Sequence, residues 1–203
     1  DKGEYWWELR NCAYYDLFEK PKIIFPNLQN NNKFCLDEDG VFINAPAVFL
    51  PVASKTLLCV LNSKLIWEFL KSICVTRSGG YIEVKPQYFE QIPIPELKNE
   101  EKFDQTADKI IGKVSELQNL QSNFIKLIQN KFEIERITQK LQNWPKLEFS
   151  DFLKELKKAK VKLTLSEEAE WMAYFNEQKQ KAQSLKSEID KTDRGIDRMV
   201  YEL

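Results

Sequence analysis

The chain has 203 residues, 43% of them apolar and 12% aromatic, and a formal net charge of −1. This composition allows one large domain or two smaller ones with a real core, and no stretch approaches the roughly 18 apolar residues of a membrane span, so we expect no membrane partner. The balanced charge excludes a surface that is basic throughout, although cations can still gather on one face. The chain begins with neither Met nor a signal-peptide pattern, and we expect it to be a piece of a longer protein.

Histidine is absent, and the four cysteines, Cys12, Cys35, Cys59 and Cys74, are widely spaced. A nucleophile activated by histidine is therefore excluded, and the usual ligand pairs of a structural zinc site are missing. Most acidic residues of the second half alternate with lysines, as on a solvated helix face. We therefore expect free thiols in a reducing cytoplasm, no catalytic residues, no metal and no cofactor in this chain.

Short apolar runs ended by Gly, Pro or Asn predict strands in the first half of the chain. These runs are residues 22–26, 40–45, 47–52 and 79–86. An Asp-Gly turn at residues 39–40 predicts that 33–36 and 41–44 pair as a hairpin.

Residues 54–73 predict two short helices that pack on this sheet. Ser54 is a suitable N-cap for the first helix, and Asn62 or Ser63 for the second. Apolar residues in the second helix fall on one helical face. The first half is therefore expected to be a small sheet with short helices.

Residues 91–95 contain Ile92-Pro93-Ile94-Pro95, and the prolines predict an extended segment without a helix. We expect Ile92 and Ile94 to anchor this segment and Asn99 to cap the helix that follows. The predicted domains are therefore residues 1–98 and residues 99–203.

Apolar residues in the second half recur at alternating steps of four and three, which indicates two helical seams of coiled-coil type. The first seam comprises Phe103, Ala107, Ile110, Val114, Leu117, Phe124 and Ile128, with Gln121 as its polar exception. The second comprises Trp171, Phe175, Gln178, Ala182, Leu185, Ile189, Thr192, Ile196, Met199 and Leu203.

The segment between the seams, residues 143–163, is long enough to turn the chain back and includes a predicted short helix at 150–159. Thr164 and Glu167 have the spacing of a capping box at the start of the second long helix. Since neither seam can bury its stripe alone, we predict a long antiparallel helical hairpin. The whole chain is thus assigned to the α+β class.

Two polar loops of the first half have the chemistry to bind DNA. Asn and Gln can bind an adenine edge, and Arg or Lys can bind guanine or phosphate. The candidate residues are Gln29, Asn30, Asn31, Asn32 and Lys33 in one loop, Arg77, Ser78 and Tyr81 in the other, and Lys20 and Lys22 around a proline. Ordinary connecting loops and exposed lysines remain the alternative.

Aromatic residues near the start of the chain could form a stacking surface for bases or part of the core. They are Tyr5, Trp6, Trp7, Tyr14, Tyr15 and Phe18. We expect them to be mostly core, because a domain of this size needs large apolar side chains.

Four segments in order resemble the TaqI-like C-terminal specificity domain of bifunctional restriction–modification enzymes. They are W-x-E-L-R at 6–10, K-P-K-I-I at 20–24, Leu-Asn-Ser at 61–63 and I-P-I-P at 92–95. Residues 163–203 also resemble the helical end of those enzymes. The resemblance implies a target recognition domain that binds double-stranded DNA, followed by a helical spacer.

The same resemblance implies a bacterial, cytoplasmic parent protein of type IIG. Its methyltransferase and nuclease domains would lie upstream in the same chain, with S-adenosylmethionine and Mg²⁺ bound there. The Asn-Pro-Pro-Tyr motif of adenine methylation is absent from this sequence. Two alternatives remain open: a helical protein-interaction or scaffold module without DNA specificity, and a specificity subunit of a type I restriction system.

Overall fold

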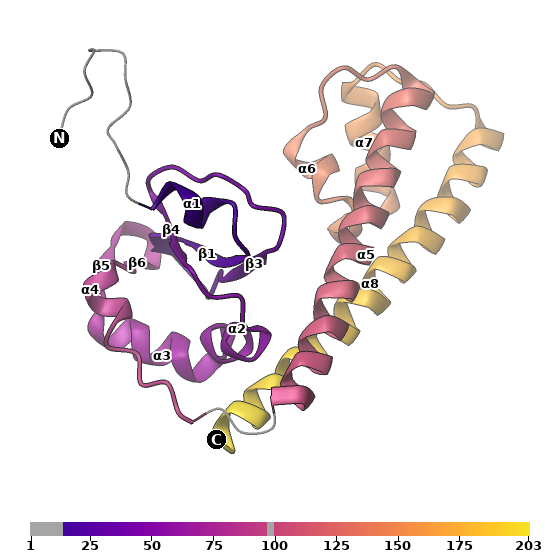
Figure 1. The fold of residues 1–203 in the computed structure, drawn as a ribbon. Coiled ribbons are helices and arrows are strands. Elements are labelled where there is room, and N and C mark those ends of the chain that lie inside the picture. Colours follow the sequence, from indigo (N-terminus) through magenta and orange to yellow (C-terminus); the bar gives the residue numbers. More distant parts are fainter. Residues whose placement is uncertain (1–13, 97–99) are drawn as a thin grey trace, which may run out of the picture. The chain divides into compact units, whose positions relative to one another are not determined.

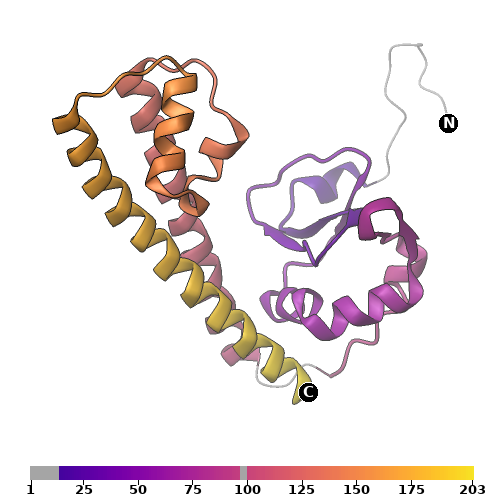
Figure 2. The ribbon, with the colours of Figure 1, turned by 180° about the vertical axis from the view of Figure 1, so that it is seen from behind.

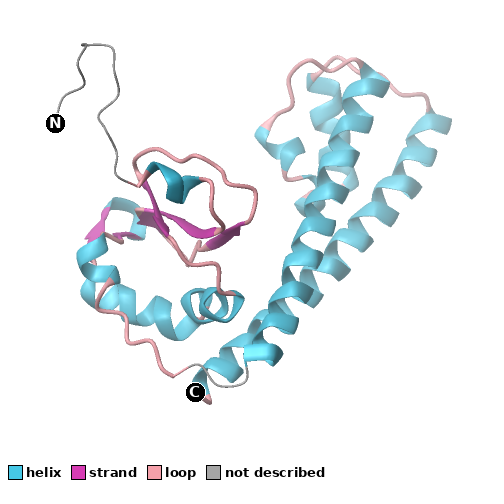
Figure 3. Cartoon of the chain, in the orientation of Figure 1, coloured by secondary structure: helices cyan, strands magenta, loops and turns pink. Residues whose placement is uncertain are grey.

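The computed structural model describes residues 14–96 and 100–203 (Figure 1). The described residues form two compact units. One contains the residues up to Ala107 together with Gly195–Leu203, and the other is Asp108–Arg194. The α+β class is confirmed, with short strands and helices in the first half and long helices in the second (Figure 3).

The first sheet of the first unit is antiparallel and has the order β3-β1-β4. The central strand β1 (Lys22–Pro26) pairs with β3 (Cys35–Asp37) on one side and with β4 (Ala47–Leu50) on the other. A short helix, α1 (Tyr15–Phe18), precedes it. The predicted strands at 22–26 and 47–52 are therefore confirmed.

The second sheet has the order β2-β6-β5. Its strands are β2 (Leu28–Gln29), β6 (Tyr81–Glu83) and β5 (Val75–Arg77), and a 3₁₀ turn, η1 (Ser78–Gly80), joins β5 to β6. Gly79 and Gly80 have φ values of +75° and +76°, which residues with a side chain adopt only at a cost. The glycine pair therefore permits this tight turn.

The helices α2 (Lys55–Asn62) and α3 (Lys64–Ile73) lie along one side of the strands. Ser54 accepts a hydrogen bond from the N–H of Leu57 at 3.1 Å, and Ser63 accepts one from Ile66 at 3.3 Å. Both predicted caps and the break between the helices are confirmed. A single turn, α4 (Pro86–Phe89), follows β6.

The predicted strand at residues 40–45 is wrong. Strand β1 is already paired on both edges, and residues 38–46 have to carry the chain from β3 at one edge to β4 at the other. The turn at Asp39-Gly40 therefore does not return the chain onto 33–36. Its Gly40 lies against Glu19, where an added Cβ would be 3.0 Å from the carbonyl oxygen.

The segment that precedes the long helices contains no helix in its described residues 91–96, as the prolines predicted. Ile92 is buried, with 8% of its surface exposed, whereas Ile94 is 45% exposed. Only Ile92 therefore anchors the segment. Asn99, the predicted cap, lies outside the described residues.

Two long helices, α5 (Glu100–Phe132) and α8 (Leu165–Tyr201), run antiparallel. In the second unit the ring of Phe132 lies 5.1 Å from that of Trp171, and the ring of Phe124 lies 6.0 Å from that of Phe175. A residue later in α5 therefore contacts a residue earlier in α8, as expected for antiparallel helices. The predicted helical hairpin is confirmed, and α8 continues through Gly195.

The seam residues of this hairpin are mostly buried or half-buried, although Val114 and Leu203 are exposed. The capping box is also confirmed, because the N–H and Oγ1 of Thr164 each donate to Oε2 of Glu167 at 2.8 Å. These hydrogen bonds, first the one from the Thr164 backbone, lower the pKa of the Glu167 carboxyl.

The connection between the long helices contains α6 (Gln139–Gln142), the 3₁₀ turn η2 (Trp144–Lys146) and α7 (Phe149–Lys158). The predicted helix at 150–159 is therefore confirmed as α7. Figure 2 shows α7 beside the C-terminal half of α5. Trp144 is fully buried and stacks on Phe124 with ring centroids 4.0 Å apart. This aromatic contact anchors the connection to the hairpin.

Candidate nucleic-acid interface

The two polar loops come together at one end of the second sheet. Gln29, the last residue of β2, lies opposite Ile82 of β6, and Arg77 of β5 lies opposite Tyr81. Because these strands are antiparallel, the loop that follows β2 emerges at the same end as the turn between β5 and β6. Two segments far apart in sequence therefore form one surface.

The loop at residues 29–33 presents three of its five candidate side chains to solvent. Asn30, Asn31 and Lys33 are exposed. The side chain of Gln29 is fully buried, and its Oε1 accepts a hydrogen bond from the N–H of Lys33 at 3.0 Å. Asn32 turns inward and donates from Nδ2 to the carbonyl oxygen of Ser63 at 2.7 Å. The base contact predicted for Gln29 is therefore wrong, because its side chain is buried. Asn32 is half-buried and holds the loop through Ser63, so its base contact stays a prediction.

Three buried side-chain atoms of this segment lack a hydrogen-bond partner within the described part of the chain. They are Oδ1 of Asn27, Nε2 of Gln29 and Oδ1 of Asn32. A buried polar group without a partner costs about 1–3 kcal/mol.

The turn at residues 77–81 presents Arg77, Ser78 and Tyr81, all exposed. The guanidinium of Arg77 donates twice to Oε2 of Glu83, from Nε at 3.0 Å and from a terminal nitrogen. The hydrogen bond from Arg77 is the main cause of a lowered pKa of the Glu83 carboxyl, with a second contribution from Lys85. An ionised Glu83 therefore holds Arg77 in place at the sheet end.

The Leu-Asn-Ser segment at 61–63 anchors the first loop, a role that the sequence did not indicate. Oδ1 of Asn62 accepts from the N–H of Phe34 at 3.2 Å, and its Nδ2 donates to the carbonyl of Phe34 at 2.9 Å. The same Nδ2 also donates to the carbonyl of Leu58 at 3.1 Å. No periodicity or cap pattern signals a contact between residues so distant in sequence.

Comparison with known protein families gives two matches. Residues 4–94 match the TaqI-like C-terminal specificity domain, and residues 96–200 match a domain of unknown function, DUF8810. The chain belongs to the DUF8810 family, whose model covers just over half of it, and its first half matches the specificity domain. No curated protein matches it. The two converging loops thus belong to a specificity domain.

Lys22 of the specificity domain cannot contact phosphate. Its side chain is 0% exposed, forms an ion pair with Asp37 and donates to the carbonyl of Phe18 at 2.6 Å. The hydrogen bond from Lys22 is also the main cause of a lowered pKa of the Asp37 carboxyl. The prediction for Lys22 is therefore wrong, whereas Lys20 is exposed.

The aromatic residues near the start of the specificity domain only partly form a core. Phe18 is half-buried and lies 4.9 Å from Phe49 and 5.3 Å from Phe42, measured between ring centroids. Tyr14 and Tyr15 are exposed, so their assignment to the core is wrong. Tyr5, Trp6 and Trp7 lie outside the described residues.

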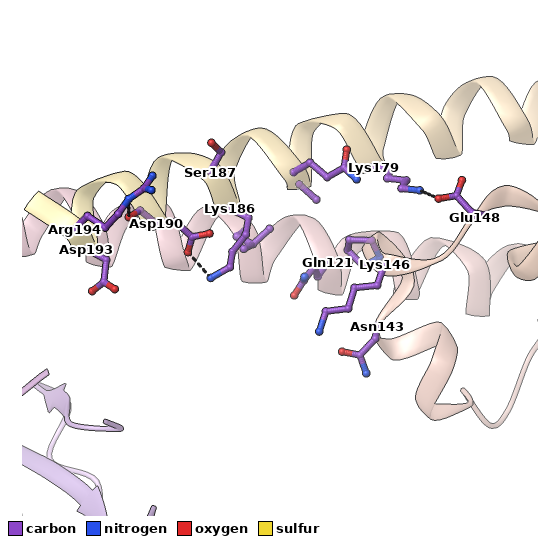
Figure 4. Close-up of a pocket in the computed structure, with 14 residues that line it drawn as sticks. Gln121, Asn143, Lys146, Glu148, Lys179, Lys186, Ser187, Asp190, Asp193 and Arg194 are labelled. Carbon is purple, nitrogen blue, oxygen red and sulfur yellow. Dashed lines mark hydrogen bonds and ion pairs between the residues drawn. The ribbon is translucent and has the colours of Figure 1, made fainter. Parts of the chain in front are cut away.

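The DUF8810 half contains a groove of about 970 Å³ between α5, the connection and α8 (Figure 4). Both cationic and acidic side chains line it: Lys179 pairs with Glu148 at 2.8 Å, and Lys186 pairs with Asp190 at 2.8 Å. Leu117 and Ala182 are apolar members of its lining. The groove therefore has a mixed lining of charged, polar and apolar side chains.

Within 14–96 and 100–203, no three Cys, Asp or Glu side chains are placed to hold a metal ion together. None of the helices described there is both long and apolar enough to cross a bilayer.

Proposed function

We propose that the chain reads a DNA sequence for a restriction–modification enzyme and directs adenine methylation and cleavage to that target site. The family of residues 4–94 supports DNA specificity. The observation that carries the proposal within the molecule is the convergence of the 29–33 loop and the 77–81 turn at one sheet end.

The exposed side chains of this surface suit distinct parts of DNA. The amides of Asn30 and Asn31 can bind an adenine edge, and the guanidinium of Arg77 can bind guanine in the same bidentate manner. Lys33 supplies a cation for phosphate, and Lys20 remains a candidate for the same role. Ser78 and Tyr81 add hydroxyl donors, so the surface combines base readout with backbone contacts.

The helical hairpin is proposed to be the spacer that positions the specificity domain within a type IIG enzyme. The methyltransferase and nuclease domains would precede it in the same bacterial, cytoplasmic protein. S-adenosylmethionine and Mg²⁺ would bind those domains and not this chain. Cys35 and Cys74 are free thiols, which suits a reducing compartment.

A helical protein-interaction module is the second candidate, and a type I specificity subunit is a variant of the first. Exposed seam residues would favour the interaction module. Phe124, Ile128, Phe175 and Ala182 are instead buried in one cluster, although Val114 and its neighbour Ile111 are exposed. The helical half therefore satisfies most of its own apolar surface and gives the interaction module less support.

Selection from a library of randomised DNA duplexes tests the proposal directly. The 203-residue chain is expected to enrich a defined sequence, and Arg77→Gln or the pair Asn30→Ala with Asn31→Ala to reduce that enrichment. Each lost bidentate base contact is expected to cost about 1–3 kcal/mol, which is roughly a 5- to 150-fold loss in affinity for the selected site.

Arg136→Gln is the matched control for Arg77→Gln, because Arg136 is equally exposed but lies in the helical half. Unchanged enrichment by the loop variants would contradict the site, and no enrichment by the natural sequence would contradict the function. In the parent enzyme, the loop variants should abolish site recognition while S-adenosylmethionine binding persists.

A further inference from the structure

One peptide group joins the recognition loop to the last turns of α8. The carbonyl of Ser63 accepts a hydrogen bond from Nδ2 of Asn32 at 2.7 Å. The N–H of Lys64, in the same peptide group, donates to Oδ1 of Asp197 at 2.7 Å. The two hydrogen bonds therefore hold opposite edges of one rigid, planar peptide group.

Both partners of this peptide group belong to the same compact unit. Gly195–Leu203 is grouped with the first half of the chain, and there Ile196 and Val200 are each 5% exposed. Burial of these two apolar neighbours on α8 thus fixes the position of Asp197. Asp197 also accepts from the first N–H of α3, where a negative charge is favourable.

Asn62 supplies a second anchor for the same loop. Its side-chain amide forms both a donor and an acceptor contact with the backbone of Phe34. Phe34 is itself buried, and its ring lies 5.0 Å from that of Phe25. The loop is therefore tied at its start by the pairing of Gln29, in its middle by Asn32 and at its end by Asn62.

We propose that Asn32, Asn62 and Asp197 are positioning residues of the specificity domain. They hold the 29–33 loop in the conformation that reads DNA, and Asp197 makes that conformation depend on the last turns of α8. The three side chains act through the backbone and not by contact with DNA. This inference rests on the proposed function and adds to it a link from the spacer helix to sequence discrimination.

The test measures the affinity of the full chain for its selected duplex and for a random duplex, together with thermal unfolding. Asn62→Asp is nearly isosteric but replaces the donor to Phe34 by a carboxylate. Asn32→Ala removes the bond to Ser63 and also an oxygen that has no partner. Each variant is expected to lower the ratio of selected to random affinity about 10-fold, because a loop that samples other conformations keeps its phosphate contacts but loses base geometry.

Asn143→Asp is the matched control for Asn62→Asp. Asn143 also lies at a helix end and donates from Nδ2 to the carbonyl four residues earlier, at 3.0 Å from Gln139. It contacts no part of the recognition loop. Its substitution is expected to leave the ratio of affinities unchanged.

Asp197 is tested by two substitutions with opposite expectations. Asp197→Asn keeps an oxygen that can accept from Lys64 and should retain most of the discrimination, whereas Asp197→Ala should lower it as Asn32→Ala does. Because both residues act through one peptide group, the double variant Asn32→Ala with Asp197→Ala should lose less than the product of the single losses.

The inference is overturned if the selected duplex is found and folded Asn32→Ala, Asn62→Asp and Asp197→Ala all keep the natural ratio. It is also overturned if the ratio falls only in variants that are unfolded at the assay temperature. Should Asn62→Asp fail to fold, Asn32→Ala decides. If the natural chain selects no duplex, the proposed function fails with it, an outcome distinct from selective binding that the variants do not alter.

Discussion

At the scale of single residues, Lys20 and Lys22 show how strand pairing decides which lysine is buried and which is exposed. They flank one proline, and nothing in their local sequence separates them. Pairing of β1 with β3 places Lys22 opposite Asp37, inside the unit. Asp37 also accepts from the N–H groups of Val41 at 2.9 Å and Asp39 at 3.2 Å. The buried pair therefore fixes the turn after β3.

Lys22→Met should destabilise the first unit by about 3–5 kcal/mol, because it leaves the carboxylate of Asp37 buried without its cation. Lys20→Met should change the free energy of unfolding by no more than about 0.5 kcal/mol, since Lys20 is exposed. Urea unfolding of both variants measures the difference. Equal effects would show that Lys22 is not held inside by Asp37.

The pH dependence of stability gives an independent test of the same pair. Hydrogen bonding from Lys22 lowers the pKa of the Asp37 carboxyl in the folded chain. The resulting stabilisation is complete above the unfolded pKa of about 4 and is lost as pH falls through the lower folded pKa. Between about pH 5 and pH 2, Lys22→Met should therefore lose less of its own stability than the natural chain does.

At the scale of elements, the sequence predicted the features that depend on neighbouring residues better than those that depend on strand pairing. The break at Asn62-Ser63, the capping box at Thr164 and the helical seams depend on residues within one or two turns, and the sequence predicted all of them. The strands β2 and β5 have two or three residues and show no period, so they were not predicted, whereas the strand predicted at 33–36 overlaps β3. The strand expected at 40–45 failed because residues 38–46 carry the chain from β3 at one edge of the sheet to β4 at the other.

The same limit applies to the candidate site. Residue types and turn signals marked the 29–33 and 77–81 segments, but only strand pairing shows that they adjoin. The inward orientation of Gln29 and Asn32 and the clamp by Asn62 arise from tertiary contacts. Such contacts leave no periodic pattern in the sequence, which is why the anchors were missed.

Trp144 gives the prediction at the element scale. Its side chain is fully buried, stacks on Phe124 and lies 5.9 Å from the ring of Phe175. Trp144→Ala should lower the free energy of unfolding of the helical unit by about 3–5 kcal/mol, because it leaves a cavity at the centre of the aromatic cluster.

Tyr174→Ala is the comparison for Trp144→Ala. Tyr174 also faces Phe124, with ring centroids 5.9 Å apart, but its side chain is 37% exposed. We expect a clearly smaller loss in urea unfolding monitored by circular dichroism at 222 nm. A loss as large as that of Trp144→Ala would contradict a core centred on Trp144.

At the scale of the whole molecule, the compact units do not coincide with the two predicted domains. The family matches meet near residue 95, close to the predicted boundary at 98. The compact units instead group Gly195–Leu203 with the first half. Assignment of residues 99–203 to a separate spacer domain stays a prediction, and the hydrogen bond from Lys64 to Asp197 joins the last turns of α8 to the first unit.

Charge balance gives the last prediction, which concerns DNA affinity. The chain has 30 basic and 31 acidic side chains, so it has no excess of cations. If DNA meets only the two proposed loops, its phosphates should contact only the few cations near them. Since each neutralised phosphate changes the slope of log K against log salt by about −0.9, we expect a slope of about −2 to −3 for a random duplex.

Fluorescence anisotropy with a labelled duplex between about 50 and 200 mM salt measures this slope, and the affinity should fall roughly 15- to 60-fold across that range. Lys33→Gln should make the slope shallower by about 1, whereas Lys157→Gln, which removes an exposed lysine of α7, should not. A slope of about −6 or steeper would show that DNA contacts many more cations than the loops supply. The helical half would then have to bind DNA itself, and its role as a spacer alone would be wrong.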